Sequence, residues 1–262
     1  MSPLSPAVAA VTSEVEKRTR GGSLFSLFLD FDGTLVPIAP DPSIPRLDSG
    51  TRVLLERIAA RRCCMIAIIS GRAIDDLYQR VGVERLIYAG NHGLEIRGPG
   101  INFVEPAAAA RVETLRILAR DLTQTLGSVK GALVEYKGLT TSVHYRKVAP
   151  TEVNRVEQAV RAAVDREHDA FAVNSGKMVL EIVPTTNWHK GSAAQWIIER
   201  LNLDERSTIF LGDDTTDEKA FSTLQQAITV RVGWAGSTEA GYHFPDFQTV
   251  REFLEWMADG RG

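Results

Sequence analysis

At residues 28–35 the chain reads Phe28-Leu29-Asp30-Phe31-Asp32-Gly33-Thr34-Leu35, an apolar run that ends in two aspartates. The run begins at Leu24, contains one serine, and is typical of a buried strand. Two carboxylates at the end of a buried strand are unfavourable unless a counter-charge compensates them, and a divalent cation can do so. Asp-Gly is also common in ordinary turns, so this stretch alone does not decide between a turn and a reactive site.

Composition limits the classes of protein to consider. The chain has 262 residues, 44% of them hydrophobic, which allows a sizeable core and one or two domains. The net charge is −3, so no basic excess points to a nucleic-acid partner. We see neither a signal-peptide pattern nor an apolar run of membrane-spanning length, and we expect a cytoplasmic protein with no membrane partner. Cys63 and Cys64 are adjacent in an apolar run, which favours buried strand residues over a disulfide or metal site.

Strand and helix patterns alternate in the first and last parts of the chain. Apolar runs predict strands, and segments with helical spacing lie between them. The expected strands are 24–29, 63–69, 86–89, 208–211 and 227–232, and the expected helices are 49–62, 73–81, 190–201 and 249–257. This alternation indicates a parallel sheet. The predicted fold class is therefore α/β, with a Rossmann-like parallel-sheet core.

The pattern changes between Pro106 and Pro184. Two helices and two hairpins follow one another there as αββαββ, at 107–126, 132–136, 141–145, 150–168, 170–173 and 178–183. Such an arrangement is typical of a small α+β domain inserted into the α/β one. We expect the core at 23–105 and 186–262, the inserted domain at 106–185, and a peripheral N-terminal segment at 1–22 with a short helix at 8–20.

Polar groups stand at four strand ends or helix starts of the expected core. They are Asp30 with Asp32, Ser70, Lys190, and Asp213 with Asp214 and Asp217. In a parallel sheet these positions meet at the carboxyl edge of the strands. Oxygen-rich sites suit Mg²⁺, and a lysine beside them suits the charge of a phosphate. The set predicts phosphoryl transfer through an aspartyl-phosphate.

Taken in order, these motifs resemble those of the haloacid-dehalogenase-like phosphatase superfamily. The resemblance implies that Asp30 is the nucleophile and that Asp32 is first the general acid and then the base that activates water. It implies that Ser70 hydrogen-bonds the phosphoryl oxygens and that Lys190 holds the nucleophile and the phosphate. Asp32 must be protonated to serve a leaving alkoxide, so we expect a raised pKa for it. An aspartate at this position argues against a dehalogenase.

The same resemblance implies a Mg²⁺ site. Its ligands would be Asp30, Asp213 and the backbone carbonyl of Asp32. Asp214 or Asp217 would support these ligands without binding the metal directly.

The inserted domain occupies the place of a type-two cap, which selects the substrate in this superfamily. Its details resemble the trehalose-phosphatase family, in the segments Gly90–Glu95, Glu135–Lys137, His144–Arg146, Gly176–Glu181, His189–Gly191 and Gly212–Glu218. The resemblance implies that glucose hydroxyls bind Glu135, Lys137, Lys177 and Glu181. Further substrate contacts would come from Gly71, Arg72, Asn91, His92, His144 and Arg146.

Structural interpretations compete with several of these roles. Lys137 and Lys177 lie beside glycines at hairpin tips, where lysines are usually solvated. Glu181 can face water on an alternating strand. The remaining alternatives are a loop contact for His92, a solvated strand face for His144 and Arg146, and a helix start for Arg72.

Three functional hypotheses follow. The first is Mg²⁺-dependent hydrolysis of trehalose 6-phosphate to trehalose and phosphate. The second is a related phosphatase acting on sucrose-phosphate, a phosphoglycerate glycoside or a hexose phosphate, which would differ in the cap alone. The third is a non-catalytic domain that binds trehalose phosphate, against which the intact Asp30 and Asp32 speak. A functional link to a trehalose-phosphate synthase stays open.

Overall fold

The computed structural model describes residues 3–19, 24–39, 43–167, 169–176, 178–233 and 236–260. The chain divides into two compact units. The first comprises Met1–Phe103 and Trp188–Gly262, and the second is Val104–Asn187. Within the described ranges, no helix combines the length and the apolar character that crossing a membrane requires.

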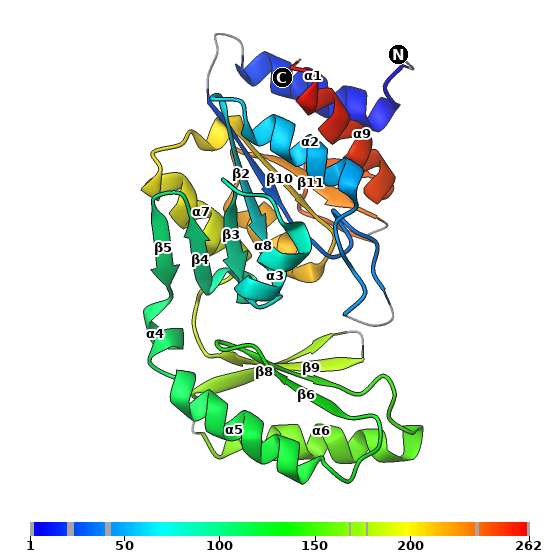
Figure 1. Cartoon of the computed structure of the whole chain (residues 1–262), viewed down its shortest axis with the longest axis vertical. Helices are drawn as coiled ribbons and strands as arrows, with labels where there is room; N and C mark the ends of the chain where they lie inside the picture. The colour runs from blue at the N-terminus through cyan, green and yellow to red at the C-terminus, as the bar shows by residue number, and fades with distance from the viewer. Residues whose placement is uncertain are drawn as a thin grey trace. The chain divides into compact units, whose positions relative to one another are not determined.

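The larger sheet contains eight strands within the described residues, in the order β12-β11-β10-β1-β2-β3-β4-β5 (Figure 1). The strands are β1 (Phe25–Leu29), β2 (Cys64–Ile69), β3 (Ile87–Gly90), β4 (Glu95–Gly98), β5 (Ile101–Val104), β10 (Thr208–Gly212), β11 (Ile228–Val232) and β12 (Tyr242–Phe244). Pairing is parallel from β12 through β3 and antiparallel between β3 and β4. The predicted parallel-sheet core is confirmed, with β1 between β10 and β2.

Helices cover both faces of this sheet. They are α1 (Pro6–Thr19), α2 (Ser49–Ala59), α3 (Ile74–Val81), α7 (Lys190–Arg200), α8 (Thr215–Thr223) and α9 (Phe247–Ala258), with short 3₁₀ turns η1 (Asn91–Gly93) and η2 (Glu205–Ser207). Leu27 and Leu29 of β1 belong to the apolar cluster that includes Val8, Leu55 and Phe253 of α1, α2 and α9. Phe28 points to the opposite face, into the cluster formed with α7 and α8. A strand buried on both faces explains the unbroken apolar run before Asp30.

Helix α1 belongs to this core. Val8, Val11 and Val15 are three and four residues apart, lie on one helical face and are buried. Helix α1 contacts α9 and β12, and Figure 1 shows α1 and α9 side by side. The expectation of a peripheral 1–22 segment is therefore wrong for this helix, because its valines complete the core. Residues 1, 2 and 20–22 lie outside the described ranges.

Three short strands, one helix and one break depart from the sequence-based expectation, and the helix is α8, at Thr215–Thr223. The hairpin of β4 and β5 and the edge strand β12 were not predicted, because runs of three or four residues show no clear period. The helix expected at 107–126 is divided into α4 (Pro106–Ala109) and α5 (Val112–Thr125). The break falls at Arg111, whose φ of −105° and ψ of 2° are not helical.

The second unit has its own sheet and core. Its antiparallel strands follow the order β6-β7-β9-β8, with β6 (Leu133–Tyr136), β7 (Thr141–His144), β8 (Phe171–Gly176) and β9 (Val179–Pro184). Helices α5 and α6 (Pro150–Asp165) cover one face, where Leu118 and Val160 pack with Val143 and Ile182. The other face carries alternating polar side chains, among them Glu135, Ser142 and Glu181.

Candidate functional site

Asp30 and Lys190 form a buried ion pair at the end of β1. Lys190 Nζ, on the first residue of α7, lies 2.6 Å from Asp30 Oδ1 and 2.8 Å from Asp217 Oδ1. Asp30 and Lys190 are only 4% and 3% exposed. Lys190 thus joins two chain segments that each follow a central strand of the sheet.

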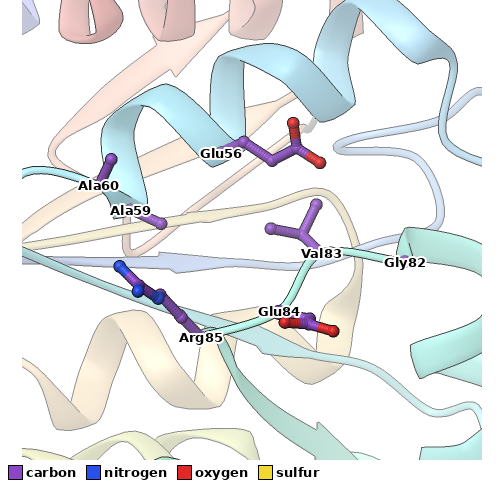
Figure 2. Close-up of a pocket in the computed structure, with 7 residues that line it drawn as sticks. All are labelled: Glu56, Ala59, Ala60, Gly82, Val83, Glu84 and Arg85. Atoms are coloured by element: carbon purple, nitrogen blue, oxygen red, sulfur yellow. The ribbon is translucent and has the colours of Figure 1, made fainter.

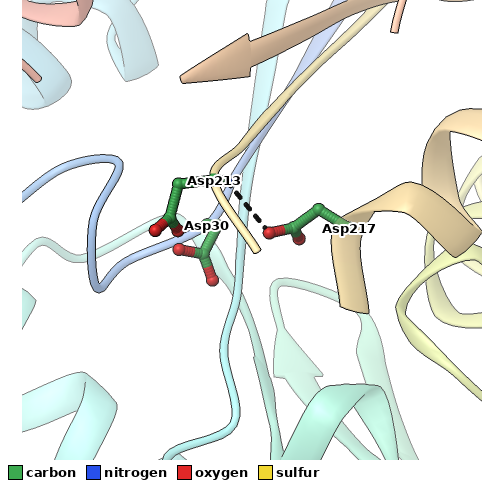
Figure 3. Close-up of side chains that lie close together, drawn as sticks. All are labelled: Asp30, Asp213 and Asp217. Carbon is green, nitrogen blue, oxygen red and sulfur yellow. Dashed lines mark hydrogen bonds between the residues drawn. The ribbon is translucent and has the colours of Figure 1, made fainter. Parts of the chain in front are cut away.

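Asp213 completes a cluster of three carboxylates. One oxygen from each of Asp30, Asp213 and Asp217 lies within 4.8 Å of the others (Figure 3). Asp217 is fully engaged, because Oδ1 accepts from Lys190 and Oδ2 accepts from the backbone N–H groups of Asp213 and Asp214, at 3.1 and 3.0 Å. Asp30 Oδ2 and Asp213 Oδ1 are buried and have no hydrogen-bond partner among the described residues.

The electrostatics of this cluster favour a bound cation. Burial raises the pKa of Asp30 well above its usual range. The charge and hydrogen bond of Lys190 oppose this shift, and the charges of Asp217 and Asp213 add to it. Burial and the Asp217 charge also raise the pKa of Asp213, to about 7. Lys190 has a raised pKa despite its burial, because Asp217 and Asp30 stabilise the ammonium. Three ionised carboxylates around one ammonium leave two negative charges in excess, which a divalent ion would balance.

The residues therefore fit Mg²⁺. Asp30 and Asp213 supply oxygens that are buried and unengaged, and hard oxygen donors are the ligands that Mg²⁺ prefers. Asp217 instead fixes the lysine and the loop that carries Asp213, as the first turn of α8 begins. Asp214 is exposed, and its carboxylate caps α8. The Asp32 carbonyl as a ligand stays a prediction.

The turn after β1 requires glycine at position 33. Gly33 has a φ of +93°, and its N–H donates to Val36 O at 2.7 Å. A Cβ at this position would lie 2.0 Å from Asp213 Oδ2. Glycine therefore serves both the left-handed turn and the close approach of the turn to the carboxylate.

The loops after β2 and β3 hold each other through their backbones. Asn91 N donates to Arg72 O at 2.7 Å, and His92 N donates to Ser70 O at 2.8 Å. Asn91 and His92 both have left-handed φ angles, of 51° and 58°. The His92 ring packs on Gly71, where a Cβ would lie 2.6 Å from His92 Cε1. Ser70 is thereby fixed at the carboxyl end of β2, next to β1 in the sheet.

Arg72 contacts the second aspartate of the opening motif. Its Nε and Nη2 atoms donate to Asp32 Oδ2 and Oδ1, both at 2.7 Å. Burial lowers the pKa of Arg72, but the hydrogen bonds and charges of Asp32 and Asp76 outweigh it and raise that pKa overall. The two parallel hydrogen bonds fix both oxygens of the Asp32 side chain.

Polar residues of the second unit pair across its sheet. Lys137 Nζ lies 2.5 Å from Glu181 Oε1, and these side chains are 8% and 16% exposed. His144 Nε2 lies 2.8 Å from Glu135 Oε2. Neither Lys137 nor Glu181 is simply a solvated side chain. Arg146 is exposed in the turn after β7, and Lys177 lies outside the described residues.

Comparison with known proteins identifies the family. The family model described as Trehalose-phosphatase matches residues 28–240. The chain belongs to the trehalose-phosphatase family. A relative from Mycobacterium avium (strain 104), named trehalose-phosphate phosphatase, is 39% identical over 246 residues, which cover 89% of this chain and 62% of the relative. This trehalose-phosphatase family chain thus spans less than two thirds of that relative's length.

Solved structures agree with the fold of this trehalose-phosphatase family member. A structure described as trehalose-6-phosphate phosphatase related protein has a TM-score of 0.75 and 26% identity, and covers 89% of this chain and 97% of its own. A haloacid dehalogenase-like hydrolase from Bacteroides thetaiotaomicron has a TM-score of 0.64, 18% identity, and coverage of 89% and 99%. The second likeness shows the fold alone.

A separate pocket lies near the amino-terminal ends of β2 and β3, whereas the acidic cluster lies at the carboxyl ends of the strands. Figure 2 shows it between the end of α2 and the connection from α3 to β3, where β2 and β3 begin. Its lining residues are Glu56, Ala59, Ala60, Gly82, Val83, Glu84 and Arg85. None of the predicted site residues of the trehalose-phosphatase family motifs lines it.

Sequence reasoning missed three polar residues of this trehalose-phosphatase family chain. Ser142 and Asn174 share a row with Glu135 and Glu181 across the four strands of the second unit. Strand registers decide this row, and they were not known from the sequence. Asp76 of α3 contacts Arg72, which precedes the helix, and the four-residue spacing of the pair in the sequence was an available signal.

Proposed function

We propose that this chain hydrolyses trehalose 6-phosphate to trehalose and phosphate, with Mg²⁺, through an aspartyl-phosphate on Asp30. The observation that carries the proposal is the buried Asp30–Lys190 pair beside Asp213, with one unengaged oxygen on each aspartate. The name of the M. avium relative supports the substrate. The chain spans only 62% of the length of that relative, so the activity that we give to this chain is a proposal.

In the first step, an Asp30 carboxylate oxygen attacks phosphorus, and the bond from phosphorus to the sugar oxygen breaks. Asp32 donates a proton to the departing alkoxide. Lys190 neutralises charge on Asp30 and on the phosphoryl group, and the Ser70 hydroxyl hydrogen-bonds a phosphoryl oxygen. When bound by Asp30 and Asp213, Mg²⁺ supplies charge neutralisation between the carboxylate and the phosphate.

In the second step, Asp32 acts as a base. Its carboxylate removes a proton from a water molecule, and the water oxygen forms a bond to phosphorus. The bond between phosphorus and Asp30 breaks, which releases phosphate and restores the Asp30 carboxylate. Asp32 recovers its proton at the same time, so the cycle closes without a net change in the protein.

We assign sugar recognition to the polar face of the second unit, which would serve as the cap at 106–185. Glu135, Lys137, Lys177 and Glu181 would bind glucose hydroxyls, since these groups both accept and donate hydrogen bonds. His144 and Arg146 would join them. On the first unit, Gly71, Asn91 and His92 are the proposed further substrate contacts. The family resemblance implies the same for Arg72, but its hydrogen bonds to Asp32 favour a positioning role. A cytoplasmic location and a link to a trehalose-phosphate synthase remain predictions.

Phosphate release tests this function. The purified protein is assayed with trehalose 6-phosphate, sucrose 6-phosphate and glucose 6-phosphate, with Mg²⁺ and with EDTA. We expect metal-dependent release that strongly prefers the trehalose ester. Metal-dependent release with another preference would overturn the sugar assignment and keep the core chemistry. No release from any ester would overturn the catalytic proposal.

Replacement of the nucleophile gives the sharpest check of the mechanism. We expect Asp30→Asn to lower kcat by about 10⁴-fold or more, because it removes the attacking oxygen. In EDTA, the unfolding temperature of the variant should equal or exceed that of the parent, because the substitution removes the buried negative charge of Asp30. Near-normal turnover in the folded variant would contradict the role of Asp30.

A further inference from the structure

Arg72 binds Asp32 through two parallel hydrogen bonds, a contact called the clamp below. Two guanidinium nitrogens donate to the two carboxylate oxygens, both at 2.7 Å, so the contact fixes the direction of the carboxylate as well as its distance. The Arg72 side chain is 12% exposed and that of Asp32 is 34% exposed. A one-third exposed aspartate in a turn would otherwise change rotamer readily.

Arg72 is itself held from two further sides. Its Nη1 atom donates to Asp76 Oδ2 at 3.1 Å. Its guanidinium carbon lies 5.5 Å from the centre of the ring of Phe31, the residue between Asp30 and Asp32. Three nitrogens and one face of the guanidinium therefore have defined neighbours, which leaves the fork little freedom.

The support continues from Asp76 to a loop. Arg80 Nε donates to the same Asp76 oxygen at 2.7 Å, and Arg80 Nη1 donates to Ser43 O and Pro45 O at 2.9 and 2.6 Å. Arg80 is buried, and its own carbonyl accepts from Leu47 N at 3.2 Å. Alternating charges thus run from Asp32 through α3 to the segment 43–47.

We propose that Arg72 is the positioning residue of Asp32, and that Asp76 and Arg80 hold Arg72 in place. The proposal rests on the function proposed above, in which Asp32 transfers the protons. It gives Arg72 a different main task from direct phosphate contact, and it predicts that lysine cannot replace it, because an ammonium cannot form the two parallel bonds.

The test compares two substrates and one inhibitor. A sugar ester needs a proton on its leaving group, and 4-nitrophenyl phosphate does not. We expect Arg72→Lys to lower kcat/KM for trehalose 6-phosphate by about 10- to 100-fold, as misplaced catalytic groups do. The loss in kcat/KM for the aryl ester should be much smaller, and the inhibition constant of inorganic phosphate should not change.

Neighbouring aspartates on α3 provide a matched pair. Asp76→Asn should lower kcat/KM for the sugar ester in the same direction as Arg72→Lys, because it weakens the hold on the guanidinium. Asp75→Asn removes the 2.7 Å contact to Arg97 on the surface and should leave both substrates unaffected. Equal losses on both esters with a weakened phosphate inhibition would overturn the proposal in favour of phosphate contact. Unchanged kinetics in Arg72→Lys would also overturn it.

A measurement without substrate separates this proposal from the proposed function. Thermal unfolding in EDTA of Arg72→Lys, Asp32→Asn and the double variant forms a double-mutant cycle. We expect the free energy of unfolding to fall less in the double variant than the sum of its falls in the two single variants. Either single change already breaks the two hydrogen bonds between Arg72 and Asp32. Additive losses would overturn the clamp even in an active enzyme. A non-additive result in a protein that releases no phosphate would support the clamp and reject only the function.

Discussion

One carboxylate of the acidic cluster is structural and two are available for chemistry. Asp217 uses both oxygens, on Lys190 and on the backbone of the Asp213–Asp214 loop. This division leaves Asp30 and Asp213 with buried, unengaged oxygens. Buried polar atoms without partners are rare in proteins, and here they mark the side on which a cation would bind.

The pKa of Asp213 predicts how the metal-free protein responds to pH. The pKa is about 7 in the folded protein and about 3.9 in an unfolded chain. Because the folded state binds this proton more tightly, its stabilising effect is complete below about pH 4 and is lost as pH rises through 7. In EDTA, the unfolding temperature should fall between pH 5 and pH 8. Mg²⁺ should raise it more at pH 8 than at pH 5.

Asp213→Asn is the control for this pH prediction. The variant lacks the titrating group, so its unfolding temperature in EDTA should depend less on pH over the same range. A parent protein whose stability in EDTA rises from pH 5 to pH 8 would contradict the assignment.

Among the elements, β1 and its turn set the geometry of the site. The strand is buried on both faces, so a shift in register would draw the charged Asp30 into the apolar interior. Asp30 follows directly, and its N–H donates to Leu211 O of β10 at 2.9 Å. The turn then places Gly33 against Asp213.

Gly33→Ala should therefore abolish turnover and reduce stability. The left-handed φ of +93° disfavours alanine by about 1–2 kcal/mol, and the Cβ would displace Asp213. Gly100→Ala is the matched control, since Gly100 has a φ of +73° and no atom within 4 Å of the added Cβ. It should show the backbone effect on stability with normal kcat. Normal activity in Gly33→Ala would refute the close approach.

In the second unit, Lys137, directly after β6, contacts Glu181 of β9, 44 residues further along the chain. Glu181→Ala should lower kcat/KM for trehalose 6-phosphate by about 10- to 100-fold, since a lost charged hydrogen bond is equivalent to about 1.5–3 kcal/mol. The loss on 4-nitrophenyl phosphate should be slight. Glu152→Ala, which removes an exposed 3.1 Å pair with Arg155 on α6, should affect neither substrate. Equal losses on both substrates in Glu181→Ala would argue against sugar recognition.

At the scale of the molecule, the first unit is assembled from the two ends of the described chain. Helix α1 packs against α9, and Ser5 N donates to Glu252 Oε1 at 2.6 Å. The valines of α1 continue the apolar layer formed by α2 and α9. The N-terminal helix is therefore part of the folded unit.

Val11→Ala should lower the free energy of unfolding by about 1–3 kcal/mol, because Val11 is fully buried. Val53→Ala on α2 is the control, since Val53 is 50% exposed, and it should change stability by less than about 0.5 kcal/mol. Chemical denaturation of both variants checks the difference. Equal stability of Val11→Ala and the parent would mean that α1 does not contribute to the core.

Much of the fold and part of the site could be predicted from the sequence. The apolar run before Asp30 and the alternation of strands and helices are strong local signals, and they predicted the parallel sheet. Helix α1 was misjudged because its three valines are separated by small and polar residues. The Arg72–Asp32 and Lys137–Glu181 contacts could not be read from the sequence, since rotamers and strand registers decide them.

The position of β1 in the sheet has a consequence for how the protein is made. Its neighbour β10 begins 179 residues after β1 ends, at Thr208 after Leu29. A ribosome therefore completes the contiguous second unit before it supplies the strand that closes the central sheet. Lys190 and Asp213 follow Asp30 by more than 150 residues, so an interrupted translation product would contain Asp30 without its buried partners. Strands that are far apart in the sequence pair slowly. The edge of β1 that pairs with β10 would therefore stay accessible to chaperones during synthesis.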